Sequence, residues 1–197
     1  VSSLLSGYGK VNYSFDDKYL IETSLRLDGS SKFGPSQKFG LFPSVAVGWN
    51  LHNENFLKNS QIFNSFKIRA SYGQLGNESI GLYQYQNLIS ATNGLETSWG
   101  NSNITWETVN MFDVGADISF SKASRFSLTF DYYNKITNDI ILKPAVSLVG
   151  GIGQAPLNAG SVKNEGLEFT LNYSPKVGKN WNMSIKPGIT YNKNTLV

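Results

Sequence analysis

The chain has 197 residues, enough for one domain, and its net charge of +3 at pH 7 is not concentrated in any Lys/Arg run, which argues against a dedicated nucleic-acid binder. It has no cysteine, which excludes disulfide bonds and thiolate metal sites. Since no run of about 18 apolar residues could form a spanning helix, a membrane crossing by this chain would have to use strands.

The main feature of the sequence is an alternation of apolar and polar residues with a period of two. Residues 19–27 are typical, with Ile21 and Leu25 on one parity and Glu22 and Arg26 on the other. Successive side chains of a strand point to opposite faces, so such a segment forms a strand with one apolar and one polar face. A barrel wall between lipid and water needs this arrangement in every strand.

The alternation predicts eight strands, paired as four hairpins, in an all-β antiparallel sheet. They are expected at residues 5–15, 19–27, 41–51, 66–74, 106–120, 125–134, 162–174 and 181–192.

The predicted connections alternate in length, as the turns and loops of outer-membrane barrels do. An exception is 52–65, a longer connection on the short-turn side in which residues 54–58 are a candidate helical turn. The short turns are predicted at 16–18, 121–124 and 175–180, and the long loops at 28–39, 76–103 and 135–160.

The apolar parity identifies the residues expected to face lipid. They are Tyr13, Ile21, Leu25, Val45, Val47, Ile68, Val114, Ile118, Leu128, Phe130, Phe169, Leu171, Ile185 and Ile189.

Aromatic residues are also expected to form an interfacial girdle near the short turns. They are Phe15, Tyr19, Trp49, Phe120, Phe126, Tyr173 and Trp181.

A soluble β-sandwich or solenoid also shows this alternation of apolar and polar residues. The predicted strands of about nine to thirteen residues, however, are long enough to cross a bilayer at a tilt, which favours the membrane barrel.

Several segments carry a family resemblance, and they follow one order over nearly the whole chain. They are 9–20, 26–34 with 42–49, 67–77, 106–108, 131–134 and 158–166, and they include GKVNYSFDDKYL, RLDGSSKFG, FPSVAVGW and KIRASYGQLGN. In these residues the chain resembles the SusC/RagA family of TonB-dependent outer-membrane transporters.

The resemblance implies a larger barrel of about 22 strands with a plugged lumen, of which residues 1–197 would be consecutive strands of the C-terminal half. We expect a partial barrel domain here, with the plug domain and signal peptide absent from it. The implied function is outer-membrane import of a polar nutrient, either an oligosaccharide or a peptide. The implied partners are the membrane lipid, a SusD-like surface lipoprotein acting as a lid, and the TonB complex, which the missing N-terminal part would contact.

No catalytic, metal-binding or cofactor-binding constellation is recognised. His52 is interpreted as a turn residue, and Gly150–Gly153 lacks the Lys-Ser/Thr and the βαβ context of a phosphate loop. The carboxylate pairs Asp113 with Asp117 and Glu165 with Glu168 are explained by a polar lumen wall.

The candidates for contact with the substrate or the lid lie in the long loops and near the strand ends beside them. Aromatic rings there could stack on sugars or anchor a protein, and the polar side chains could bind a polar nutrient. These candidates are Arg26, Asp28, Lys32, Tyr83, Tyr85, Trp99 and Asn134.

Two other functions are less well supported by the sequence. One is a stand-alone small outer-membrane barrel with a structural or adhesive role. A complete barrel of that kind should show its own signal peptide and terminal aromatic, and neither is seen. The other is an enzyme, either a barrel hydrolase or a soluble β-fold glycosidase. It would need convergent acid and base groups on the loop side, which the sequence does not show, so we do not expect an enzyme.

Overall fold

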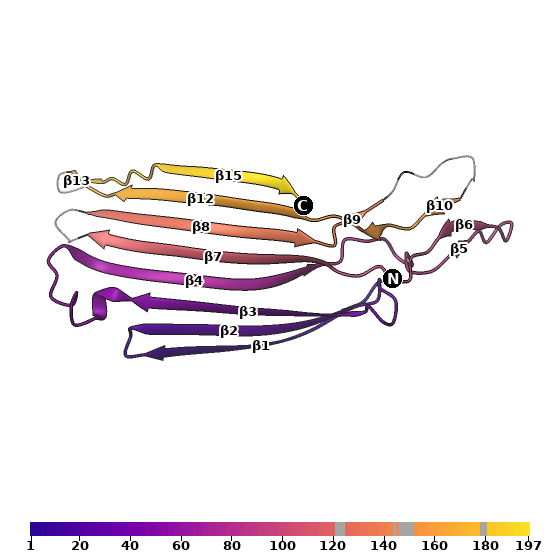
Figure 1. Ribbon diagram of the computed structural model, residues 1–197, viewed down its shortest axis with the longest axis horizontal. Coiled ribbons are helices and arrows are strands. Elements are labelled where there is room, and N and C mark those ends of the chain that lie inside the picture. Colours follow the sequence, from indigo (N-terminus) through magenta and orange to yellow (C-terminus); the bar gives the residue numbers. More distant parts are fainter. Residues whose placement is uncertain (121–124, 144, 146–151, 178–180) are drawn as a thin grey trace.

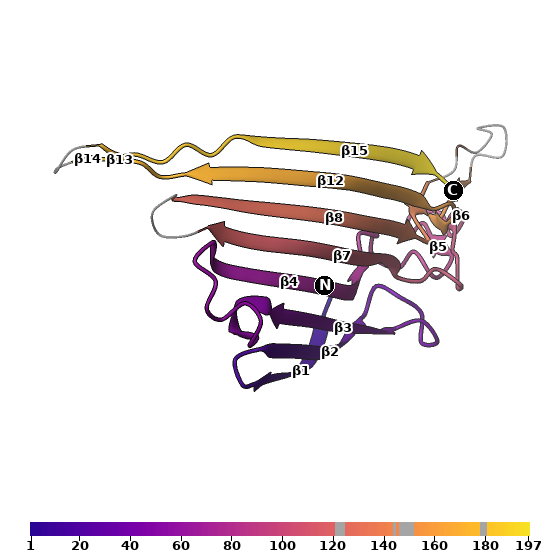
Figure 2. The ribbon, with the colours of Figure 1, turned by 60° about the vertical axis from the view of Figure 1, so that its left-hand side comes forward.

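The computed structural model describes the chain except for residues 121–124, 144, 146–151 and 178–180 (Figure 1). Its long strands form a single layer, an 8-stranded antiparallel sheet in the order β1-β2-β3-β4-β7-β8-β12-β15 (Figures 1 and 2). These strands are β1 Leu4–Phe15, β2 Tyr19–Ser30, β3 Phe39–Asn50, β4 Phe63–Asn77, β7 Glu107–Phe120, β8 Phe126–Asn138, β12 Val162–Tyr173 and β15 Gly188–Leu196. The predicted all-β antiparallel class is confirmed.

Smaller elements occupy the connections. They are the 3-10 helix η1 Leu51–Asn53, a three-stranded sheet of β5 Leu88–Ile89, β6 Glu96–Trp99 and β10 Gly153–Gln154, and two pairs, β9 Ile141–Leu142 with β11 Leu157–Asn158 and β13 Lys176–Val177 with β14 Trp181–Asn182. The long loops therefore contain secondary structure that the alternation did not predict. Within the described residues, no helix is long and apolar enough to cross a membrane.

Seven of the predicted strands agree with the structure to within a few residues, but the eighth was placed wrongly. Residues 181–192 were expected to form it, whereas β15 begins at Gly188. The ring of Pro187 removes a backbone donor, and Trp181–Asn182 pairs with Lys176–Val177 instead. Between β14 and β15, an isolated antiparallel β-bridge pairs Ile185 with Tyr173 at the end of β12.

The connection on the short-turn side folds as the sequence suggested. After η1, the carbonyl of Glu54 accepts hydrogen bonds from the amides of Leu57 and Lys58 at 2.9 and 2.7 Å, which closes a helical turn. The predicted turn at 121–124 lies outside the described residues, as does half of the turn at 175–180 and half of the Gly150–Gly153 motif.

The register aligns the apolar parity of every long strand on one face of the sheet. One continuous cross-strand row illustrates this: Tyr13, Ile21, Val47, Ala70, Val114, Tyr132, Leu167 and Tyr191. All the residues predicted to face lipid lie on this apolar face, and many of its large side chains are exposed. An apolar surface of this extent requires a cover of lipid or protein.

Side chains at the short-turn end of the sheet are tied together. The ring of Tyr19 stacks with Trp49 at a centroid distance of 6.3 Å and with Phe15 at 6.5 Å. The Glu54 Oε1 atom accepts hydrogen bonds from Tyr19 Oη at 2.8 Å and Trp49 Nε1 at 3.1 Å. Both hydrogen bonds lower the pKa of the Glu54 carboxyl below its usual value, and the bond from Tyr19 has the larger effect. The 52–65 connection is thereby fastened to the β1–β2 hairpin.

A buried apolar cluster lies at the opposite, long-loop end. It consists of Phe33, Phe42, Ile80, Ile104 and Trp106, with the Trp106 ring 4.9 Å from Phe33 and 5.6 Å from Phe42. Phe42 belongs to β3, and the other four residues lie in or beside the long loops. The cluster therefore attaches two long loops to the end of the sheet.

We expect Ile104→Ala to loosen this attachment. Its side chain is 0% exposed, so the change removes buried methyl groups and leaves a cavity, which costs about 2–5 kcal/mol. Hydrogen exchange in the full-length protein should show faster exchange in residues 31–38 and 78–106. The control is Ile89→Ala at an exposed site, and equal exchange in the two variants would contradict the assignment.

Candidate functional site on the polar face and long loops

The polar face of the sheet carries an ion cluster that spans three strands. Arg69 of β4 contacts Asp113 through Nη1 and Asp117 through Nε, both at 3.1 Å, and donates from Nη2 to Asp131 of β8. The register explains the cluster, because Arg69 lies opposite Gly115, and Gly115 lies opposite Asp131 on its other side. Asp113 and Asp117 flank Gly115 on the same face of β7.

Gly115 leaves space at the centre of this cluster. A Cβ atom there would lie 2.3 Å from Asp131 Oδ1 and 2.7 Å from Arg69 Cζ, closer than non-bonded atoms approach. The missing side chain makes room for the guanidinium to lie across β7. The sequence suggested Asp113 and Asp117 as a carboxylate pair, and in the structure both carboxylates contact the Arg69 guanidinium.

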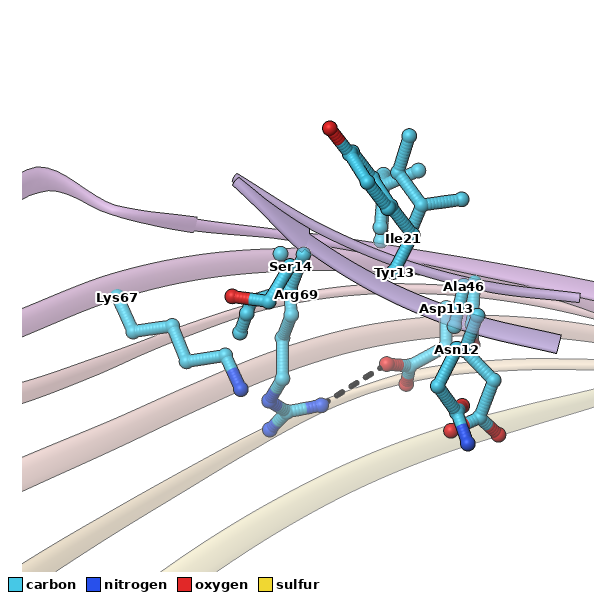
Figure 3. A pocket seen from close by; sticks show the side chains of 14 residues that line it. Asn12, Tyr13, Ser14, Ile21, Ala46, Lys67, Arg69 and Asp113 are labelled. Atoms are coloured by element: carbon cyan, nitrogen blue, oxygen red, sulfur yellow. Dashed lines mark hydrogen bonds and ion pairs between the residues drawn. The ribbon is translucent and has the colours of Figure 1, made fainter. Parts of the chain in front are cut away.

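A hollow of about 460 Å³ opens on the polar face beside the cluster. Figure 3 shows Lys67, Arg69 and Asp113 on one side of the sheet, with Tyr13 and Ile21 projecting from the other side. Charges of both signs, from Glu22, Lys67, Arg69 and Asp113, line the hollow beside apolar surface, so the hollow can bind polar or zwitterionic groups.

Three of the predicted contact residues near the loops are engaged in internal ion pairs. Arg26 Nε lies 2.7 Å from Asp28 Oδ2, and the guanidinium lies 5.7 Å from the centre of the Phe42 ring. Asp28 is 5% exposed, so it offers little surface to a ligand. Lys32 Nζ bonds the Glu78 carboxylate at 3.2 Å and its backbone carbonyl at 3.3 Å. These contacts stabilise the loop bases.

The structure separates the other four predicted contact residues. Tyr85 packs against the buried cluster, whereas Tyr83 and Trp99 are exposed, and Tyr83 has a positive φ of 60°. Asn134 pairs with Phe112 and therefore lies on the apolar face. The seven residues do not form one site, and their contact with substrate or lid stays a prediction.

Sequence reasoning missed the Arg69 cluster and the burial of Phe42. The sequence did contain a signal for the cluster. Asp113 and Asp117 lie on the same face of one predicted strand, and the predicted strand before it carries Arg69.

Among the described residues, no group of three or more His, Asp or Glu side chains is placed to hold a metal ion. His52 Nδ1 lies 3.3 Å from the Phe66 amide, a bond that holds the turn.

A double-mutant cycle with Arg69→Gln and Asp131→Asn tests the cluster. We expect a coupling free energy of about 0.5–3 kcal/mol, because each side chain compensates the desolvated charge of the other. Urea unfolding of the full-length protein in lipid vesicles measures it. The control cycle uses Lys10→Gln and Glu22→Gln, an exposed pair 2.8 Å apart that should couple by about 0–1 kcal/mol. Coupling no larger than in this control would contradict the assignment.

Comparison with known proteins gives consistent matches over the whole chain. TonB-dependent receptor P3 of Formosa agariphila is 34% identical over 206 residues, which cover 100% of this chain and 20% of that protein. TonB-dependent receptor SusC of Bacteroides thetaiotaomicron is 30% identical over 210 residues, covering 99% of this chain and 21% of that protein.

The structure of the RagAB peptide importer in its open-open state superposes with a TM-score of 0.87 and 28% identity, covering 99% of this chain and 22% of that chain. The chain therefore spans about one fifth of the length of the curated relatives that it matches.

The sequence model of the family described as "TonB dependent receptor-like, beta-barrel" matches residues 2–196. This match covers all the long strands of the sheet. The chain therefore belongs to the TonB-dependent receptor β-barrel family, whose members are proteins of the bacterial outer membrane.

Proposed function

We propose that this chain is part of the barrel wall of an outer-membrane importer, energised through TonB, that takes up oligosaccharides or peptides. The observation that carries the proposal is the family match over residues 2–196. The names of the relatives support it, since they are receptors and, for RagAB, a peptide importer.

The sheet itself supports a partial barrel. Within the described sheet, β1 pairs with β2 alone and β15 pairs with β12 alone. Exposed edges of this length aggregate unless they are paired. We infer that further strands of the same protein complete the wall, and that a plug domain and a signal peptide precede it.

The two faces fit this placement. The apolar face would contact outer-membrane lipid, and the Arg69 cluster and the hollow beside it would face the lumen. The long-loop end would face outward, where a SusD-like lipoprotein would close over it, and the TonB complex would act through the N-terminal part. The polar wall needs no catalytic group for this role.

The lipid-facing assignment is tested by two neighbouring positions of β12. Phe169→Arg would place a charge in lipid, at a cost of about 2–4 kcal/mol near the midplane, whereas Thr170→Arg would place it in the lumen and be tolerated. Heat-modifiable mobility of the full-length protein in outer-membrane fractions measures assembly. Equal losses in both variants would contradict the assignment.

Import is tested by deleting the gene in the source bacterium and measuring uptake of fluorescent oligosaccharides and peptides. Loss of uptake of one of these classes, with rescue by the full-length protein, supports the proposal. Rescue with a matched variant that lacks the TonB-contacting segment should fail, because energy could not reach the barrel. Unchanged uptake after deletion would overturn the proposal.

A further inference from the structure

The small sheet of β5, β6 and β10 projects beyond the loop end of the main sheet (Figure 1). Its central strand, β6, pairs with β5 on one side and with β10 on the other. The Trp99 carbonyl at the end of β6 also accepts a hydrogen bond from the Ala155 amide at 2.8 Å. The backbone that carries the Trp99 side chain is therefore held from two directions.

The indole of Trp99 is held as well. Its Nε1 donates to Glu96 Oε2 at 3.2 Å, and Asn87 Nδ2 donates to Glu96 Oε1 at 3.1 Å. Asn87 Oδ1 accepts from the amide of Gly100 at 2.9 Å, which closes a ring of contacts that begins and ends beside Trp99. We call Trp99, Glu96 and Asn87 the Trp99 platform.

Gly100 allows the platform to form. A Cβ atom at this position would lie 2.2 Å from the carbonyl carbon of Gln86, so any other residue would push the two segments apart. The close approach brings Asn87 within reach of both the Gly100 amide and Glu96. The residue after Trp99 thus has a structural reason to lack a side chain.

Trp99 is nevertheless 53% exposed. Leaving a large aromatic ring in water forgoes the stabilisation that burial would give, as Tyr85 obtains against the buried cluster. An exposed ring that is already fixed loses little conformational entropy when a ligand stacks on it. The ring is therefore pre-organised for contact.

The polar groups beside the ring define the ligand. Each Glu96 oxygen retains a lone pair, and Asn87 Nδ2 retains a second hydrogen. A pyranose matches this arrangement, since its C–H face is apolar with slight positive charge, complementary to the negative face of an indole, and its hydroxyls lie at the ring edge. The Glu96 charge disfavours an anionic sugar.

We propose that the Trp99 platform is a binding site for neutral oligosaccharides on the outward side of the long loops. One sugar ring stacks on Trp99, and its hydroxyls hydrogen-bond with Glu96 and Asn87. The proposal rests on the importer proposed above and assigns its substrate class to glycans.

The test uses the full-length protein, purified in detergent, on a printed array of plant, algal and animal glycans. Neutral glycans that bind are then titrated by calorimetry against three variants. Trp99→Ala should weaken binding by roughly tenfold or more, because the stacking face is lost. Trp99→Phe keeps an aromatic face and should retain most of the affinity. Ile89→Ala, at a 64% exposed site on β5, should bind as the unaltered protein does.

Three outcomes would overturn the proposal: no neutral glycan binds above background, Trp99→Ala binds as well as the unaltered protein, or Ile89→Ala loses as much affinity as Trp99→Ala. The last would indicate an apolar surface that docks a protein. Unchanged heat-modifiable mobility shows that each variant is folded. Binding in detergent needs no TonB, so intact glycan binding without uptake in cells would contradict the importer and leave this site standing.

Discussion

The register between neighbouring strands is the constraint on which the rest of this structure depends. Side chains alternate along a strand, so a slip of one residue between two strands would exchange the apolar and polar faces. The pairing of Ile21 with Val47 and of Val47 with Ala70 keeps the apolar row continuous. The same register sets Arg69 opposite Gly115 on the other face. A slipped pairing would therefore move apolar side chains onto the polar face and turn the Arg69 guanidinium onto the apolar face.

Sequence alternation could predict the faces because it is a local property, visible within one strand. It failed where the local pattern and the backbone chemistry disagreed. Met183 and Ile185 continue the alternation of the last strand, but Pro187 cannot donate a ladder hydrogen bond, so β15 begins after it. The alternation predicted no strand within the long loops because strands of two residues, such as β5 and β10, are too short to show a period.

The candidate sites were harder to predict because they depend on distant pairs. Arg69 reaches Asp113 and Asp131 across 44 and 62 residues of sequence, contacts that only the sheet order brings together. Tyr85 and Trp99 looked equivalent in the sequence, as aromatics in one polar loop. Packing distinguishes them, since the buried cluster takes up one ring and a hydrogen bond to Glu96 holds the other in solvent.

The two aromatic roles in that loop depend on each other. Tyr85 anchors its segment to the buried cluster, and the Asn101 amide bonds the Gln84 carbonyl at 2.8 Å, which ties the end of the Trp99 segment to the same anchor. The side chain of Asn101 also donates to the Pro156 carbonyl at 3.1 Å, next to β10. The exposed ring of Trp99 is thus connected through hydrogen bonds to the rigid end of the sheet. A ligand that reaches it meets a surface that is already ordered, and so it does not have to supply the free energy of ordering a loop.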